Sequence, residues 1–314
     1  MTAHDGLKIG LNLPTWPLRD GGYATWPDMR VLARDMEALG VDTLWVPDHF
    51  QRSLPGRPLF GFWECWTVLT AAAETTTRIG IGPFIACTGF RNPALLAKMA
   101  ATLDEVSGGR LVLGLGSGVP ARDDSWRAFG FPSGRHVGRY VEAVEITVRM
   151  LRERTVTFEG THFRTDGAEI IPRGPRTDGP PVWVAALGER TAEVAARWGD
   201  SANVNTALCA TADVTAIRAT MARACEAVGR DPATLGITGW SRLSLTPDGT
   251  AVPREGYLAG SPAEVGAQVR AFHGAGLAHL TFYVGAEGDP SPLPALTAET
   301  LGRFAPVLEA IRAG

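Results

Sequence analysis

The chain has few cysteines, and their spacing is not that of a metal site or a redox motif. Four cysteines occur among 314 residues, with no Cys-x-x-Cys pair and no histidine at the spacing of a zinc ligand. The six histidines are equally scattered. We therefore expect reduced thiols, no disulfide framework and no metal, as is usual for a cytoplasmic protein.

An excess of charge of one sign is also missing, and so are long apolar runs. Thirty basic and 33 acidic residues leave a net charge of −3, which argues against a nucleic-acid or membrane partner. No apolar run approaches the roughly 20 residues that span a bilayer. The first residues lack a basic region followed by an apolar one, so we expect no signal peptide. The sequence predicts a cytoplasmic protein.

Apolar segments are abundant, and they alternate between strand-like and helix-like patterns. The chain is 45% hydrophobic and 20% charged, with a mean hydropathy of +0.02, which is typical of a globular protein with a large core. Parallel strands require helical crossovers, so this rhythm predicts a single (β/α)8 barrel over residues 1–314, with loop insertions at its C-terminal face. The predicted strands are residues 8–13, 41–46, 78–88, 110–116, 182–186, 201–205, 236–245 and 279–284.

One departure from this rhythm is a pair of short alternating runs on either side of Glu159-Gly160. Their pattern predicts a small β-hairpin inserted at about residues 155–165. No change of composition accompanies it, so we expect no second domain.

Asp48 and His49 are the first candidates for chemistry. They follow the buried strand at 41–46, which stops at Pro47. In a parallel barrel the functional side chains lie at the C-terminal ends of the strands. The alternative is that Asp48 only caps the loop and His49 is an ordinary polar residue near the surface.

Two further strand ends favour a ligand. Gly114-x-Gly116-x-Gly118 lacks the dinucleotide-binding spacing and is followed by Pro120, so we interpret it as a place where a flat ligand lies close to the backbone. The segment 186–191 joins a strand to a helix N-terminus, where exposed amides suit a phosphate. Many βα loops look like this, so the phosphate prediction needs further support.

Three motifs together resemble a known family. They are Leu44-Trp-Val-Pro-Asp-His-Phe50, the run from Phe90 to Gly116, and Ala128-Phe-Gly-Phe-Pro132. Over nearly the whole chain the sequence is similar to the luciferase-like flavin and deazaflavin oxidoreductases, which share a (β/α)8 barrel. Members are often dimers, so the resemblance implies a homodimer.

The resemblance implies specific site residues. The flavin or deazaflavin ring is expected over the barrel mouth, with a non-proline cis peptide near Cys87 behind it and the cofactor phosphate on amides around 187–190. His49 is expected to assist proton or hydride chemistry as the catalytic residue, while Asp48 orients it or contacts the cofactor. The predicted cofactor-binding residues are Asp48, Cys87, Thr88, Gly116, Ser117, Gly118, Ala186, Leu187, Gly188, Glu189 and Arg190.

The resemblance favours hydride transfer between coenzyme F420 and a small organic substrate. The alternative is a two-component monooxygenase that uses reduced FMN, oxygen and a flavin reductase. A third interpretation, a cofactor-free binding barrel, remains open because a fold does not fix a function.

The loops at the barrel mouth predict only the chemical class of the substrate. Sugar-phosphate dehydrogenases of this family carry a glutamate just after the strand-four glycines, whereas this chain has Val119-Pro120, so we do not expect a sugar phosphate. The loops 14–26, 51–62, 119–136 and 246–260 are expected to build the substrate pocket. Their aromatic and arginine side chains suggest an apolar or aromatic substrate with room for one anionic group. The residues considered are Phe60, Trp63, Trp126, Arg127, Arg135 and Arg254.

Overall fold

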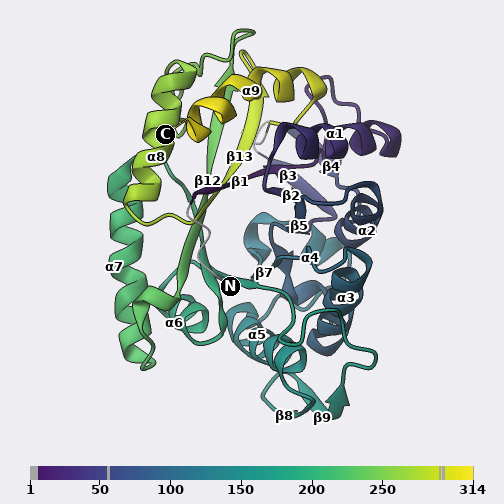
Figure 1. Cartoon of the computed structure of the whole chain (residues 1–314). Helices are drawn as coiled ribbons and strands as arrows, with labels where there is room; N and C mark the ends of the chain where they lie inside the picture. The colour runs from purple at the N-terminus through teal and green to yellow at the C-terminus, as the bar shows by residue number, and fades with distance from the viewer. Residues whose placement is uncertain (1–5, 55–56, 290, 292–293, 314) are drawn as a thin grey trace.

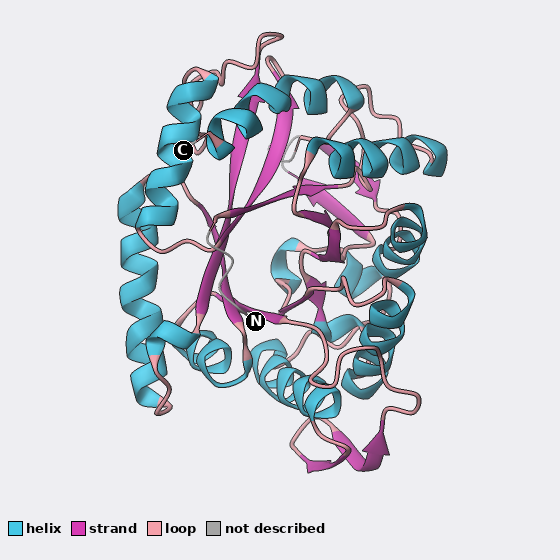
Figure 2. Ribbon diagram, in the orientation of Figure 1, coloured by secondary structure: helices cyan, strands magenta, loops and turns pink. Residues whose placement is uncertain are grey.

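Helices surround a parallel sheet in the computed structural model, which describes residues 6–54, 57–289, 291 and 294–313 (Figures 1 and 2). The sheet consists of β1 (Lys8–Asn12), β2 (Thr43–Val46), β5 (Gly80–Pro83), β6 (Ala86–Cys87), β7 (Leu113–Gly116), β10 (Val182–Ala186), β11 (Ser201–Ala207), β12 (Gly236–Leu245) and β13 (His279–Ala286). The helices are α1 (Trp26–Leu39), α2 (Cys65–Thr75), α3 (Pro93–Val106), α4 (Ser125–Ala128), α5 (His136–Arg152), α6 (Glu189–Trp198), α7 (Thr211–Ala227), α8 (Pro262–Gly274) and α9 (Ala298–Arg312).

The sheet closes into a barrel because its two end strands are consecutive pieces of one predicted strand. The order is β5-β2-β1-β13-β12-β11-β10-β7-β6, and β5 and β6 are separated only by Phe84 and Ile85. A bridge between Ile81 and Leu111 adds a contact across the same seam. The predicted (β/α)8 barrel is therefore confirmed, with the third strand at 78–88 split in two.

The peptide bond between Phe84 and Ile85 is cis. The sequence resemblance implied a non-proline cis peptide near Cys87, and the observed bond lies two to three residues before Cys87. The bond lies in the interruption between β5 and β6, before the short β6 begins.

Helix boundaries follow from capping residues that are visible in the sequence. At the start of α1, Thr25 and Asp28 form a capping box, and Gly40 ends the helix with a φ of 85°. The Asn92 side chain accepts hydrogen bonds from the amides of Ala94 and Leu95 at the start of α3. These local signals define the ends of α1 and the start of α3.

Trp45 of β2 fills the interior of the barrel, and two glycines make room for it. Its ring is fully buried and lies 4.7 Å from Trp183, measured between centroids. A Cβ at Gly10 would lie 2.2 Å from Trp45 Nε1, and one at Gly82 would lie 2.1 Å from the Val112 carbonyl oxygen. Glycine is therefore required at both positions, and the packed interior closes the barrel beneath its mouth.

Two hairpins are inserted at opposite ends of the barrel. The strands β3 (Gln51–Leu54) and β4 (Arg57–Gly61) pair between β2 and α2, at the C-terminal ends of the sheet strands. The hairpin expected at about 155–165 corresponds to β8 (Thr155–Glu159) and β9 (Arg164–Glu169). It lies between α5 and β10, hence on the side where the strands begin. No helix within the described residues is long and apolar enough to cross a membrane.

We predict that Gly82→Ala destabilises the protein by about 1–3 kcal/mol, because the added methyl group meets a backbone oxygen that cannot move freely. Urea unfolding measures the change. Gly302→Ala is the control: this exposed helical glycine has nothing within 4 Å of a built Cβ, so stability is expected to stay constant or rise by up to about 1 kcal/mol. Equal destabilisation by both substitutions would contradict the close packing around Trp45.

Candidate active site

A cavity of about 400 Å³ opens at the C-terminal ends of the strands. This volume lies within the range of small-molecule sites. Phe84, Ile85 and Trp240 line the cavity and also pack against the Trp45 cluster, so they form its floor. The lining is Trp16, Pro47, Asp48, His49, Arg52, Leu54, Phe62, Phe84, Ile85, Cys87, Gly116, Ser117, Gly118, Val119, Arg122, Asp123, Ala185, Leu187, Asn203, Trp240, Arg242 and Tyr283.

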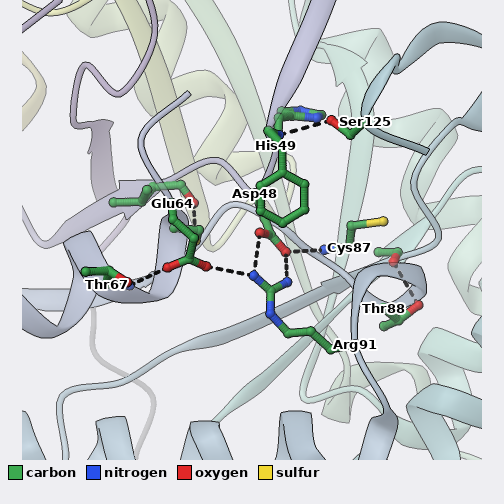
Figure 3. Close-up of polar contacts among 12 residues, drawn as sticks. Asp48, His49, Glu64, Thr67, Cys87, Thr88, Arg91 and Ser125 are labelled. Carbon is green, nitrogen blue, oxygen red and sulfur yellow. Dashed lines mark hydrogen bonds and ion pairs between the residues drawn. The ribbon is translucent and has the colours of Figure 1, made fainter. Parts of the chain in front are cut away.

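Asp48 is held by an ion pair in the wall of this cavity (Figure 3). Arg91 donates to its two oxygens at 2.6 and 3.0 Å, and the Cys87 amide donates to Oδ2 at 2.9 Å. The same guanidinium reaches Glu64, the N-cap of α2, at 2.9 Å. Burial raises the pKa of Asp48, while the contacts from Arg91 and Cys87 oppose that shift. Asp48 thus ties the end of β2 to β6 and α2.

His49 is oriented by Asp123, which comes from the loop after β7. The two side chains meet at 2.6 Å between His49 Nδ1 and Asp123 Oδ2. Burial acts to raise the pKa of Asp123, but hydrogen bonds from His49 and Ser125 outweigh it and lower that pKa. An ionised carboxylate only accepts hydrogen bonds, so Nδ1 carries the proton and Nε2 is left for a ligand. His49 is 31% exposed and lines the cavity.

Residues 124 and 125 also bind the chain just after His49. Ser125 Oγ accepts hydrogen bonds from the amides of Phe50 and Gln51, each at 3.0 Å. The Asp124 carboxylate accepts from the Ser53 amide at 2.6 Å and from its hydroxyl at 2.5 Å. The backbone that follows His49 is therefore fixed to the loop that supplies Asp123.

Asp48 and His49 are adjacent in sequence, but their side chains have different partners. The sequence assigned to Asp48 the orientation of His49 or a contact with the cofactor. The structure gives the first role to Asp123 instead, and Asp48 is bound to Arg91. Asp123 was missed because nothing in the loop 119–136 distinguishes it from its neighbour Asp124.

The predicted cofactor-binding residues divide into two groups. The lining contains Asp48, Cys87, Gly116, Ser117, Gly118 and Leu187. Outside the lining are Thr88, Ala186, Gly188, Glu189 and Arg190. The Thr88 hydroxyl donates to the Gly116 carbonyl oxygen at 3.1 Å, so it joins β6 to β7 behind the cavity wall. The aromatic and arginine side chains that the sequence predicted for the substrate pocket also lie outside this lining, whereas Arg52 and Arg242 are part of it.

The amides at the start of α6 are only partly available to a ligand. The Thr191 hydroxyl oxygen accepts from the Leu187 amide at 2.8 Å and from the Gly188 amide at 2.9 Å. The next two amides belong to the first helical turn, in which no intrahelical acceptor exists. A built Cβ at Gly188 would meet nothing within 4 Å, so the helix N-terminus is open.

A closed parallel barrel with a cavity at the strand ends has the architecture of the barrel enzymes, whose active sites lie at that face. The comparison with known families is more specific. The chain belongs to the luciferase-like monooxygenase family, whose model matches residues 7–249.

Individual relatives are similar over different lengths. The chain is 37% identical over 170 residues to the F420-dependent glucose-6-phosphate dehydrogenase of Intrasporangium calvum, covering 52% of this chain and 49% of that protein. It is 30% identical over 296 residues to F420-dependent glucose-6-phosphate dehydrogenase 1 of Rhodococcus jostii, covering 79% and 85%. The chain thus spans about half the length of the first of these relatives and most of the second.

A solved structure is similar over almost the whole chain. An F420-dependent secondary alcohol dehydrogenase in complex with an F420–acetone adduct superposes with a TM-score of 0.78 at 21% identity. The match covers 98% of this chain and 99% of that one. At this identity the likeness shows the fold.

We predict that Arg91→Met destabilises the protein by about 3–5 kcal/mol near neutral pH, because it leaves the Asp48 carboxylate buried without its partner. The folded-state pKa of such a carboxyl lies above its unfolded value, so protonation relieves the cost. The deficit should therefore shrink between about pH 7 and about pH 5. Urea unfolding at both pH values measures this.

Two further variants sharpen the test. Asp48→Asn combined with Arg91→Met should recover part of the loss, since the fully buried carboxylate is gone and the Glu64 carboxylate, which also loses its partner, is partly exposed. Arg164→Met is the control, because its ion pair with Glu159 is exposed on both sides and is worth about 0–1 kcal/mol. A deficit in Arg91→Met as small as that of the control would count against the role given to the buried pair.

Proposed function

We propose that the protein transfers hydride between coenzyme F420 and a small organic alcohol or carbonyl compound. The observation that carries the proposal is the Asp123-oriented His49, which faces a cavity at the barrel mouth. The names of both dehydrogenase relatives include F420, and they belong to the same family as this chain. We also propose a single-domain, cytoplasmic homodimer, as is common in this family.

The cavity fits a flat cofactor with anionic parts. Its floor is apolar. The Ile85 side chain packs directly against Gly114 and Gly116, and a Cβ at either glycine would lie 2.6 Å from it. Gly118 has a φ of 64°, and a Cβ there would lie 2.7 Å from Cys87 Sγ. These glycines keep the wall flat at the place where the ring is expected. The first-turn amides of α6 remain the proposed contact for the cofactor phosphate.

His49 carries the proton chemistry in this proposal. Bound F420 supplies the hydride acceptor or donor. His49 Nε2 accepts the proton of a substrate hydroxyl group, or returns it to a carbonyl oxygen in the reverse direction. Asp123 fixes the tautomer and stabilises the imidazolium that forms. Asp48 acts indirectly, since its ion pair holds the strand end from which His49 projects.

Val119 supports a substrate other than a sugar phosphate. Its side chain lines the cavity at the position where the sugar-phosphate dehydrogenases of this family carry a glutamate. An apolar side chain there removes a general acid and favours a less polar substrate. We therefore expect this protein to share the cofactor of the two glucose-6-phosphate dehydrogenases and not their substrate.

An FMN-dependent monooxygenase is the second candidate, favoured by the name of the family to which the chain belongs. The fold accommodates either cofactor. In that case reduced FMN would come from a flavin reductase, and His49 would face the site of oxygen chemistry.

A binding titration separates the two candidates. We expect purified protein to bind F420 with micromolar affinity and FMN at least about 10-fold more weakly, in oxidised and reduced forms. Ligand fluorescence and thermal shift measure both. Tight binding of reduced FMN with consumption of oxygen would establish the monooxygenase instead, and binding of neither cofactor would refute both candidates.

We predict that Asp123→Asn lowers kcat by about 100-fold or more, because an amide no longer enforces the Nδ1–H tautomer. His49→Ala should cost at least as much. The affinity for F420 should change little in either variant, since neither group binds the phosphate. Steady-state reduction of F420 with a panel of alcohols measures kcat. Unchanged kcat in both variants would show that this pair is outside the reaction.

A further inference from the structure

Three arginines line the cavity, and within the described residues none of them forms an ion pair with a carboxylate: Arg52, Arg122 and Arg242. Arg122 is exposed, whereas Arg52 and Arg242 are partly buried. Arg52 comes from β3 and Arg242 from β12, so they approach from different elements. The Nε atom of each is buried and has no hydrogen-bond partner among the residues that the structure describes. A buried donor of a charged group without an acceptor is costly, so such groups are normally satisfied by a partner.

The two guanidiniums lie around the same tyrosine. Burial raises the pKa of Tyr283 to about 12, and the positive charges of Arg242 and Arg52 both oppose that shift. Arg242 is held in place by stacking, with its guanidinium carbon 4.6 Å from the centroid of Trp240 and 5.6 Å from that of Tyr257. The stacking holds the Arg242 guanidinium in place beside Tyr283, and Arg52 adds a second positive charge there.

The charge of these two arginines is not compensated by the rest of the lining. The cavity contains two carboxylates, and both are engaged: Asp48 with Arg91 and Asp123 with His49. Arg52 and Arg242 thus leave the region around Tyr283 positive. Such a region attracts an anion and suits bidentate recognition.

The two arginines lie away from the expected phosphate position of the cofactor. In the strand order, β12 and β13 are followed by β1 and β2, whereas α6 follows β10. Around the barrel, β13 with Tyr283 and β2, which precedes Arg52, are each three strands from β10, while β12 with Arg242 is two strands from it. Trp16 contacts Tyr283 at 6.1 Å and Phe62 at 6.3 Å between centroids, which adds an aromatic wall beside the arginines.

We propose that Arg52 and Arg242 bind an anionic group of the substrate, which is a small organic acid with an aromatic or apolar body. The anion is a carboxylate or a phosphate monoester, both of which match the guanidinium fork. This inference rests on the proposed function only in calling the ligand a substrate. The anion site itself does not depend on F420.

The test uses benzoate, phenyl phosphate and neutral benzamide as probes on the full chain, without and with F420. Quenching of tryptophan fluorescence and calorimetry measure binding. At least one of the two anions should bind about 10-fold more tightly than benzamide, and Arg242→Met and Arg52→Met should each weaken it by about 10-fold or more. The preferred anion identifies the class of substrate. Benzamide affinity should stay constant in both variants.

Control variants separate this proposal from its competitors. Arg127→Met removes an arginine whose side chain is 86% exposed and outside the lining, so anion affinity should change by less than about 3-fold. Arg242→Lys should restore part of the affinity if charge is what matters, and thermal unfolding checks that each variant is folded. Equal binding of anions and benzamide would overturn the proposal.

A second outcome would also overturn it. If Arg52→Met and Arg242→Met weaken F420 or FMN binding while leaving benzoate and phenyl phosphate unaffected, the arginines serve the anionic part of the cofactor. Failure of F420 to bind, with anion binding intact, would instead refute the proposed function and leave the anion site standing.

Discussion

The bidentate ion pair between Asp48 and Arg91 is the constraint on which the rest of the site depends. It joins the end of β2 to the amide of Cys87 on β6, and through Glu64 it reaches the start of α2. These elements flank the interruption in the third strand, where the sheet closes. Because the pair is almost fully buried, its partners cannot separate without leaving a charge in an apolar environment. The loop that follows β2 therefore begins from a fixed point.

The direction of His49 follows from a second constraint, imposed by the loop after β7. The Asp123 carboxylate accepts a hydrogen bond from the His49 imidazole, while Ser125 and Asp124 bind the backbone of the residues that follow His49. One loop thus sets both the tautomer and the position of the histidine. The same cavity is lined by Arg52 and Arg242 near Tyr283, where we propose the anion site.

Much of this fold is predictable from the sequence, because its signals are local. Alternating apolar strands, Gly40 and Asn92 specify the βα units, and Pro47 locates the Asp48-His49 strand end. The unpredicted parts depend on distant contacts. Asp123 is 74 residues from His49, and Arg91 is 43 residues from Asp48. The split of the third strand into β5 and β6 likewise depends on how the two ends of the sheet meet, which no local sequence pattern encodes.

The role of a side chain is harder to predict from the sequence than its place at a strand end, because the role depends on contacts with residues distant in sequence. The strand end predicted His49 as a candidate, but the carboxylate that contacts its ring is Asp123 and not the neighbouring Asp48. Arg52 and Arg242 have ordinary sequence surroundings, and only the closed barrel brings both to Tyr283. The arginines considered from the loop sequences lie outside the cavity lining, since a loop sequence does not specify which of its side chains points inward.

Nitrogen-15 NMR of the histidine rings tests most directly whether Asp123 orients His49 towards the cavity. With the His49 signals assigned by the His49→Ala variant, neutral His49 in the native protein should show the Nδ1–H tautomer with an unprotonated Nε2. In Asp123→Asn the preference should be lost. A predominant Nε2–H tautomer in the native protein would contradict the account, because the nitrogen facing the substrate would then be unable to accept a proton.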